Sequence, residues 1–260
     1  MKMVNAAAIV ATILVLVVGP SCVSFGGWGG SGNTIDFGSR RLTTNTWGAS
    51  PGEPLDCGVF LNRDKTFGWY WDRLDPQLKP GDKFIRPIYP NVRIGASPLE
   101  RSNARQFPIK VGDIKSLAFD VSYEYLALPT GAYNLAYEMF LSDTKKSGPN
   151  LAPKAEVMIW IHRTFTQPAD SYEGDFTDGN NSYLLYSWVT SEGRLYASFI
   201  MKGEPQYQGQ HIVDAKALLD QLDLEPTWYV LGVQFGSEIV NGSGRIQINK
   251  LNINVNGHKL

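Results

Sequence analysis

The chain contains few of the residues that bind metals or form disulfide bonds, with two cysteines and three histidines among 260 residues. The histidines, His162, His211 and His258, have no ligand spacing, so the sequence indicates no metal site and no cofactor. An excess of positive charge is also lacking, since 24 Lys and Arg stand against 25 Asp and Glu and the net charge is −1. Nucleic acid and anionic membrane surfaces are therefore not expected as partners, and no protein partner is implied.

No apolar run is long enough for an ordinary membrane-spanning helix, because the longest such run covers only residues 6–18. This run follows the short basic start Met1-Lys2-Met3 and precedes small residues, which is typical of a secretory signal. We therefore expect residues 1–22 to be a signal peptide or an N-terminal membrane anchor, with Cys22 as a candidate for lipid attachment. The Gly/Ser-rich residues 23–33 are expected to form a linker, and residues 34–260 the folded domain. This organisation predicts a secreted or extracellular protein, either free or tethered to the cell surface.

Aromatic residues, by contrast, are abundant at 12%, and 26 Gly with 15 Pro provide frequent turns. Strand-like segments recur between these turns at residues 42–47, 67–71, 83–94, 115–126, 133–141, 155–165, 182–190, 194–202, 227–235 and 245–255. Many short strands at this spacing predict an all-β fold, a sandwich or jelly roll. Only residues 212–222 have apolar residues at helical spacing, which predicts one short helix packed against the sandwich.

Two of these strands place a glutamate on a face that is otherwise suited to binding. At the two-residue period of a strand, Glu156, Met158 and Trp160 share one face, while Val157, Ile159 and Ile161 would form the other. The second strand, residues 231–238, puts Gln234 and Glu238 on one side and Leu231, Val233 and Phe235 on the other. The sequence therefore predicts two carboxylates on a polar face backed by a core. Trp160 is expected to be exposed beside Glu156, where its ring could stack on a sugar.

A third strand contributes another acid, Glu138, on the same side as Asn134. A carboxyl group next to a carboxylate can share a proton with it and separate the two pKa values. His162 continues the Glu156 face and is expected to be either a solvated residue at the strand end or a residue bordering the site. Paired carboxylates of this kind are what glycosidic-bond cleavage requires, one to protonate the leaving oxygen and one to attack or to activate water.

Six segments together resemble glycoside hydrolase family 12, the endo-β-1,4-glucanases that share a jelly-roll fold with the family 11 xylanases. The similar segments are Asn45-Thr46-Trp47-Gly48 with Cys57, Trp69-Tyr70-Trp71, Tyr89-Pro90-Asn91, Asn134-Leu135-Ala136-Tyr137-Glu138-Met139-Phe140, Glu156-Val157-Met158-Ile159-Trp160 and Gln234-Phe235-Gly236-Ser237-Glu238. They occur in the family's order along residues 42–255. The resemblance implies a jelly-roll β-sandwich of two antiparallel sheets with a concave substrate cleft.

The resemblance also implies roles for individual residues. Glu156 would be the nucleophile and Glu238 the general acid/base of a retaining mechanism. Glu138, where many members have Asp, would support Glu156. The residues implied to bind substrate are Asn45, Trp47, Asn134, Met158, Trp160 and Gln234, with Trp47 and Trp160 as stacking platforms. The family's disulfide would join Cys57 to a cysteine near the mature N-terminus, but Cys22 lies further upstream than that partner usually does.

Several alternatives stay open from the sequence. The implied activity is hydrolysis of internal β-1,4 bonds in cellulose or mixed-linkage β-glucan, without a cofactor, and a xyloglucan-specific endoglucanase is an alternative. A non-catalytic carbohydrate-binding β-sandwich would also account for the tryptophans, although it does not need two acids. A family 11 xylanase is disfavoured by Met158-Ile159-Trp160. Whether Trp69 and Trp71 line the cleft or the core is open.

Overall fold

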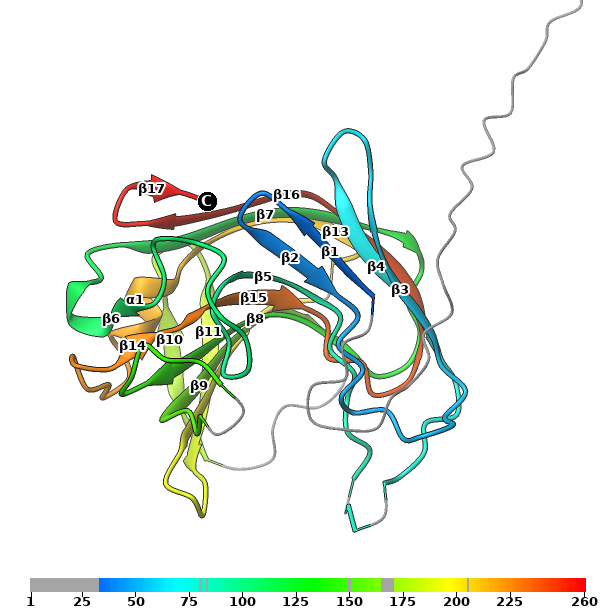
Figure 1. Ribbon diagram of the computed structural model, residues 1–260, viewed down its shortest axis with the longest axis horizontal. Helices are drawn as coiled ribbons and strands as arrows, with labels where there is room; N and C mark the ends of the chain where they lie inside the picture. The colour runs from blue at the N-terminus through cyan, green and yellow to red at the C-terminus, as the bar shows by residue number, and fades with distance from the viewer. Residues whose placement is uncertain (1–32, 80, 83, 149–150, 165–170, 205) are drawn as a thin grey trace, which may run out of the picture.

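The computed structural model describes residues 33–260 except 80, 83, 149–150, 165–170 and 205. Its described regular structure consists almost entirely of strands in two sheets, with one short α-helix (Figure 1). The predicted all-β sandwich is thereby confirmed. The predicted N-terminal segment 1–22 and all of the linker except Asn33 lie outside the described residues. Within the described part of the chain, no helix has the length and hydropathy needed to cross a membrane.

The larger sheet has eleven described strands and carries the segments that the sequence analysis singled out. Its main path runs through β1 (Thr34–Phe37), β2 (Arg40–Thr43), β5 (Asn91–Gly95), β15 (Gly232–Gly236), β8 (Asn134–Ser142), β9 (Ala155–Arg163), β12 (Leu195–Met201), β11 (Ser182–Val189) and β10 (Tyr172–Thr177). At one side, β14 (Tyr229–Val230) pairs with β8 and with β6 (Ile109–Lys110), which leads into the 3₁₀ turn η1 (Val111–Asp113).

The smaller sheet has six described strands and lies over the larger one, both following the same arch in Figure 1. Its order is β13 (Gln208–Asp214), β7 (Leu117–Ala127), β16 (Gly242–Val255), β4 (Phe67–Arg73) and β3 (Asp56–Leu61), with β17 (His258–Lys259) paired to β16. β7 and β16 are the long central strands, and their register shifts at two bulges. Bulges of this kind bend a strand and increase its twist, which is consistent with the arch.

The core fills the space between the sheets. Tyr137, Val157 and Phe235 from the larger sheet pack in one buried cluster with Phe119 and Trp69 from the smaller sheet. Trp71 belongs to the same cluster, so both tryptophans of β4 are core residues rather than substrate contacts. Cys57 is buried there as well, whereas Cys22 lies outside the described residues. We call the opposite face of the larger sheet, which points away from the smaller sheet, the concave face.

A second, smaller cluster of buried side chains lies on the concave face, formed by Ala136, Met158, Trp160, Tyr186 and Ile200. These residues come from β8, β9, β11 and β12, and each occupies the alternate position to a core residue on its strand. The two-residue alternation predicted for residues 156–160 is therefore confirmed.

His162 departs from the prediction because the alternation breaks at Ile161. The register between β8 and β9 shifts there, so that Ala136 pairs with Trp160 but Leu135 pairs with His162. One extra residue in a strand reverses the face of every residue after it. His162 is buried, contacts Tyr133 Oη at 2.9 Å through Nε2 and approaches the carbonyl of Gln206 at 3.0 Å through Nδ1. Both expectations for His162, a solvated residue or one bordering the site, are wrong.

The predicted helix 212–222 is shorter than expected. Residues Gln208–Asp214 form strand β13, which pairs with β7, and α1 covers only Ala215–Leu219. Asp214 caps the helix by accepting a hydrogen bond from the amide of Ala217 at 3.1 Å. Ile212, an expected member of the apolar stripe, is 51% exposed on the strand. Pairing with β7 satisfies the backbone groups of these residues, which overrides the local helical spacing.

One strand pair in the larger sheet is parallel, in contrast to the predicted antiparallel arrangement. β12 runs parallel to β9, with Tyr196 opposite Glu156 and Ser198 opposite Met158. The chain reaches β12 only after forming β10 and β11 further out in the sheet, and such a long connection permits parallel pairing.

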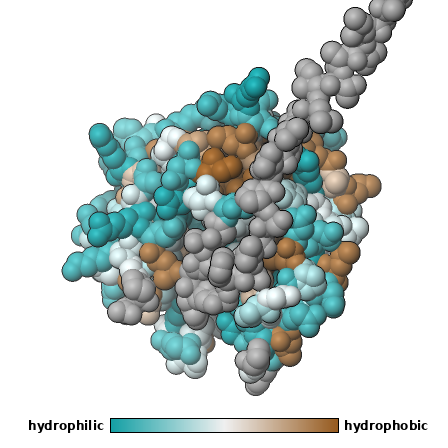
Figure 2. Space-filling view, turned by 45° about the vertical axis from the view of Figure 1, so that its right-hand side comes forward, coloured by the Kyte–Doolittle hydropathy of each residue, from teal (hydrophilic) through white to brown (hydrophobic). Residues whose placement is uncertain are grey.

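The outer surface is mostly hydrophilic on the side shown in Figure 2, with separate hydrophobic patches.

Candidate active site

Three carboxyl groups meet on the concave face at the centre of the larger sheet. Glu138 lies on β8 with Gln234 of β15 as its partner on one side and Met158 of β9 on the other. Glu156 is diagonal to Glu138, since its direct partner on β8 is Phe140. Glu238 follows the end of β15. The sequence prediction that these three acids share one face is therefore in agreement with the fold.

The carboxyl groups of Glu138 and Glu156 interact directly. A hydrogen bond joins the two carboxyl groups, and it raises the pKa of Glu138 while it lowers that of Glu156. Burial and the negative charges of Glu156 and Glu238 hold the pKa of Glu138 well above its usual range. These shifts favour a neutral Glu138 that donates to an ionised Glu156, as expected for two buried acids in contact.

A cation lies beside Glu156. Arg194 Nη1 is 3.5 Å from Glu156 Oε2, and Arg194 immediately precedes β12. Burial raises the pKa of Glu156, whereas the positive charge of Arg194 and the hydrogen bond from Glu138 both oppose that shift. The tight turn that precedes β12 is fixed by the Thr190 amide donating to the Arg194 carbonyl at 2.8 Å. This turn positions the backbone of Arg194.

Glu238 is held by Asn134 from the neighbouring strand. Asn134 Nδ2 donates to Glu238 Oε2 at 2.6 Å, and the Glu238 amide donates to Asn134 Oδ1 at 2.8 Å. Burial, assisted by the charge of Glu156 and opposed by the hydrogen bond from Asn134, raises the pKa of Glu238 to about 7. Glu238 can therefore both donate and accept a proton near neutral pH.

The backbone on either side of Glu238 is anchored in the core. Ser237 Oγ accepts a hydrogen bond from Trp69 Nε1 at 3.1 Å, and the carbonyl of Ile239 accepts one from Arg73 Nη1 at 2.8 Å. Arg73 is itself fully buried and paired with Glu53 at 2.5 Å. Because removing one partner of a buried ion pair typically costs about 3–5 kcal/mol, we expect the intact pair to be needed to support this backbone. Glu53 belongs to the acidic, proline-containing stretch that follows Trp47.

The floor of the site is formed by sulfur and aromatic groups. Met158 Sδ accepts hydrogen bonds from Tyr196 Oη at 3.0 Å and from Trp160 Nε1 at 3.5 Å. The Trp160 side chain is only 3% exposed, so the prediction that its ring is an exposed stacking platform is wrong. Its neighbours Ala136, Tyr186 and Ile200 pack around it in the buried cluster of the concave face. Trp160 therefore supports Met158 from within the sheet surface.

Asn45 and Trp47 lie in the segment after β2 and have no described contact with the carboxyl groups. The Asn45 carbonyl accepts a hydrogen bond from the Tyr89 amide at 2.9 Å, and the buried Tyr89 Oη donates to the Ala136 carbonyl at 3.4 Å. The charges of all three glutamates add to the effect of burial in raising the pKa of Tyr89. Asn45 is thus connected to the acid cluster through Tyr89, whereas the half-buried Trp47 ring lies under Arg86, whose Cζ is 5.9 Å from its centroid.

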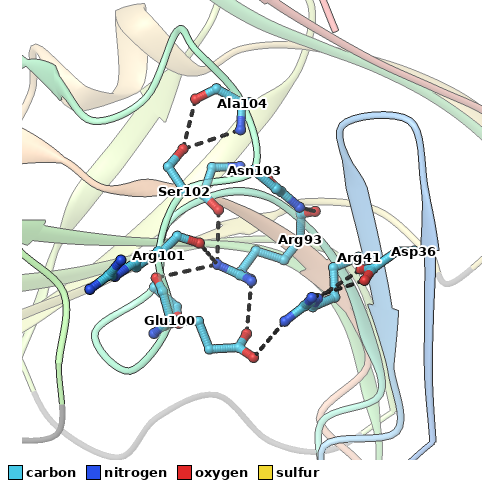
Figure 3. Close-up of polar contacts among 10 residues, drawn as sticks. Asp36, Arg41, Arg93, Glu100, Arg101, Ser102, Asn103 and Ala104 are labelled. Atoms are coloured by element: carbon cyan, nitrogen blue, oxygen red, sulfur yellow. Dashed lines mark hydrogen bonds and ion pairs between the residues drawn. The ribbon is translucent and has the colours of Figure 1, made fainter.

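Charged residues occupy the part of the concave face beyond Gln234. Arg93 on β5 is the direct neighbour of Gln234, and Arg41 on β2 is the neighbour of Arg93. Figure 3 shows Arg93 donating to the carbonyls of Glu100 and Arg101 and, together with Arg41, facing the Glu100 carboxylate. The loop that contains Glu100 is therefore fastened to this end of the face.

Residues around the site that the sequence analysis did not single out are Arg194, Tyr196, Ser198, Tyr186 and Arg93, and Tyr89 was noted only as part of a motif. The alternation of Tyr196 and Ser198 with Ala197 and Phe199 is visible in the sequence. It predicts a two-faced strand, but it does not reveal that this strand lies beside Glu156.

The arrangement consists of a carboxylate, an acid with a pKa near neutrality and a neutral carboxyl that hydrogen-bonds the carboxylate. This set can protonate one atom of a substrate bond while a carboxylate attacks the other atom of the same bond. Within the described ranges, no group of three or more His, Cys, Asp or Glu is arranged to hold a metal ion.

Comparison with known proteins gives one consistent result. The family model described as Glycosyl hydrolase family 12 matches residues 41–256. Endoglucanase S of Pectobacterium parmentieri is 27% identical over 234 residues, which cover 84% of this chain and 83% of that protein. A family 12 xyloglucanase from Bacillus licheniformis, solved in complex with ligand, is 26% identical with a TM-score of 0.74, and the match covers 86% of this chain and 96% of that chain. Endoglucanase cel12A from Rhodothermus marinus, at 19% identity and a TM-score of 0.69 over 88% of this chain and 96% of that chain, shares the fold.

Proposed function

The chain belongs to glycosyl hydrolase family 12, and we propose that it is a secreted endo-β-1,4-glucanase that cleaves cellulose or mixed-linkage β-glucan by a retaining double displacement. Family membership makes it a glycoside hydrolase of the cellulase type that acts on a polysaccharide. The proposal concerns the substrate, the mechanism, the site residues and the secretion.

The observation that carries the proposal is that Glu238 and Glu156 meet on one face with different partners, Asn134 at Glu238 and a carboxyl group and a cation at Glu156. Glu238 has a pKa of about 7, so it holds a proton at mildly acidic pH and can give it to the departing sugar oxygen. Glu156 receives a hydrogen bond from Glu138 and lies 3.5 Å from Arg194, which both favour its carboxylate. Glycosidases of both stereochemical types need one protonated and one ionised acid, and in the retaining type the ionised acid attacks the sugar itself.

In the proposed reaction, Glu156 attacks the anomeric carbon while Glu238 protonates the leaving oxygen. A bond forms between Glu156 and the sugar as the glycosidic bond breaks. Glu238, now ionised, then takes a proton from water, and that water releases the sugar from Glu156 with the original anomeric configuration. Glu138 acts as a positioning residue, and Asn134 orients Glu238. Asn45, Trp47, Met158 and Gln234 are proposed to shape the substrate subsites, with Trp160 supporting Met158 from below.

Xyloglucan is the second candidate substrate. One similar protein is named an endoglucanase and another a xyloglucanase, at nearly equal identity of 27% and 26%. Branched and unbranched glucans are accepted or rejected by the loops around the site rather than by the carboxyl groups. Soluble mixed-linkage glucan is our first choice because it needs no space for side branches.

Reducing-sugar release from mixed-linkage β-glucan, carboxymethylcellulose, xyloglucan and xylan tests the activity. We expect release from a glucan, and its near-complete loss in Glu156→Gln and Glu238→Gln. Glu225→Gln, an exposed glutamate before β14, is the matched control and should keep full activity. Binding without release would instead indicate a carbohydrate-binding module, and preference for xylan would indicate a xylanase. Proton NMR of the first product tests retention, because an inverted anomer would contradict the mechanism.

Secretion is proposed from the basic start and the apolar run at residues 6–18. N-terminal sequencing of the protein recovered from medium and from membranes distinguishes the outcomes. A new N-terminus near residue 23 in the medium would support cleavage, an intact N-terminus in membranes would support an anchor, and intact protein in the cytoplasm would contradict export.

A further inference from the structure

A row of aromatic side chains continues from Glu156 across the concave face. Tyr196 on β12 is the direct neighbour of Glu156, and Trp188 on β11 is the direct neighbour of Tyr196. Because directly opposed residues in a sheet point to the same face, all three side chains lie on the concave side. The row therefore leads from the carboxyl groups toward the β10 edge of the sheet.

The two rings form a fixed pair. Their centroids are 4.0 Å apart with an interplanar angle of 29°, which is a stacked arrangement. Tyr196 Oη donates to Met158 Sδ at 3.0 Å and accepts from Ser198 Oγ at 3.3 Å. Tyr196 is thus held by the floor of the site, and Trp188 is held by Tyr196. A ligand that contacts them would not have to order them first.

A core role does not account for this pair. Trp188 and Tyr196 lie on the face opposite the main core, and both remain partly exposed. Within the described part of the chain, the indole N–H of Trp188 has no hydrogen-bond partner. An apolar ring with a free donor at its edge suits a pyranose, which presents C–H groups on its faces and hydroxyls around its rim.

A second aromatic pair extends the same surface. In the adjacent row across the sheet, Met158 is opposite Ser198, and Ser198 is opposite Tyr186. Tyr172 on β10 pairs with Tyr186, and their ring centroids are 5.7 Å apart. Tyr172 is 55% exposed. This end of the concave face is therefore aromatic, whereas the end at β2 and β5 carries the ion pairs of Figure 3. The two ends would contact a bound chain differently.

We propose that Trp188 and Tyr196 form a glucosyl-binding subsite beside Glu156, in which Trp188 contacts one sugar ring of the β-glucan chain. This inference rests on the proposed function, because it takes the substrate to be a linear glucan. The subsite determines how long a chain must be before it is cleaved efficiently.

Cello-oligosaccharides of increasing length test the subsite. In the wild type, kcat/KM should rise about tenfold when an added glucose reaches Trp188, a size expected for one aromatic contact. Trp188→Ala should lose that step, and Trp188→Phe should keep most of it. Tyr70→Ala, which removes an aromatic from the outward side of β4, is the matched control and should behave as the wild type. Near-UV circular dichroism checks that each variant is folded.

The outcomes separate this proposal from the proposed function. An active wild type whose length profile is unchanged in Trp188→Ala would overturn the subsite and leave the endoglucanase assignment standing. If the wild type releases no sugar, the endoglucanase assignment fails, and calorimetric binding of cellohexaose decides the subsite. Weaker binding in Trp188→Ala would then support it, and equal binding would overturn it.

Discussion

Arg194 Nη1 lies 3.5 Å from Glu156 Oε2, and the two residues meet only because β12 pairs in parallel with β9. The arginine is 37% exposed at its side chain, while Glu156 is mostly buried. A cation in this position favours the ionised form of a carboxyl group that burial would otherwise neutralise. The relationship connects the sheet topology with the reactivity of Glu156.

Replacing Arg194 by Gln should move the acidic limb of the kcat/KM profile to higher pH. Without the cation, burial raises the pKa of Glu156 further, so less of the carboxylate is present at acidic pH. Arg194→Lys should restore much of the original profile, because it keeps the charge. The measurement is kcat/KM against pH at low and high salt, and the wild-type advantage should shrink with salt. An acidic limb that stays in place in Arg194→Gln would contradict the role.

Glu138→Gln should keep far more activity than Glu138→Ala. Burial and the charges of Glu156 and Glu238 raise the pKa of Glu138, which favours its neutral carboxyl as a donor to Glu156, and a glutamine amide can also donate. We expect Glu138→Gln to stay within about tenfold of the wild-type kcat, since only the geometry of one hydrogen bond changes. Glu138→Ala should lose more, and the pKa of Glu156 should rise. Equal losses in the two variants would show that the hydrogen bond is not what matters.

Asn134→Ala should lower kcat by about ten- to a hundredfold, as expected for the loss of hydrogen bonds to a charged group. The donation from Asn134 Nδ2 lowers the pKa of Glu238, so its removal should shift the alkaline limb of the pH profile upward. Asn249→Ala, on the exposed surface of β16, serves as the control. A downward shift of the alkaline limb would be incompatible with this assignment.

Glu238→Gln should stabilise the protein at alkaline pH. The pKa of Glu238 is about 7 in the folded state against 4.5 in the unfolded chain, so the folded state binds the extra proton. Its contribution to stability is therefore lost as pH rises from 4.5 through 7. Glutamine carries no charge, and the variant should unfold at a higher temperature than the wild type at pH 8, with no such gain at pH 4. Thermal unfolding at both values, with Glu225→Gln alongside, checks the difference.

His162 should lower the stability of the protein at acidic pH, whereas Glu238 lowers it at alkaline pH. Burial lowers its pKa to about 4 from 6.5, so the unfolded chain takes up a proton first and stability is lost as pH falls from 6.5 to 4. His162→Gln should be less stable at pH 7, because its contacts with Tyr133 and Gln206 are altered, but should lose less on acidification. Urea unfolding at a series of pH values measures this slope, and exposed His258→Gln should leave it unchanged. A steeper slope in His162→Gln would refute the assignment.

Local sequence patterns correctly predicted which side chains share a face wherever a strand follows a plain two-residue alternation. Glu156, Met158 and Trp160 share a face for that reason, and so do Gln234 and Glu238. The same rule failed at His162, because a bulge at Ile161 reverses the alternation. It failed again at Ile212, where pairing with β7 took precedence over helical spacing. Neither the bulge nor the pairing is visible in a single stretch of sequence.

The sequence by itself determined the all-β class, the family and the three acids on one face, because these depend on side-chain alternation and on ordered motifs along the chain. Only the tertiary structure decided what surrounds those acids. Arg194, Tyr196 and Trp188 reach Glu156 because β12 and β11 pair onto β9, and Trp160 is covered by residues from neighbouring strands. Burial and the charges of residues from distant segments shift the pKa values of these acids. Strand pairing, rather than local sequence pattern, brings those residues together.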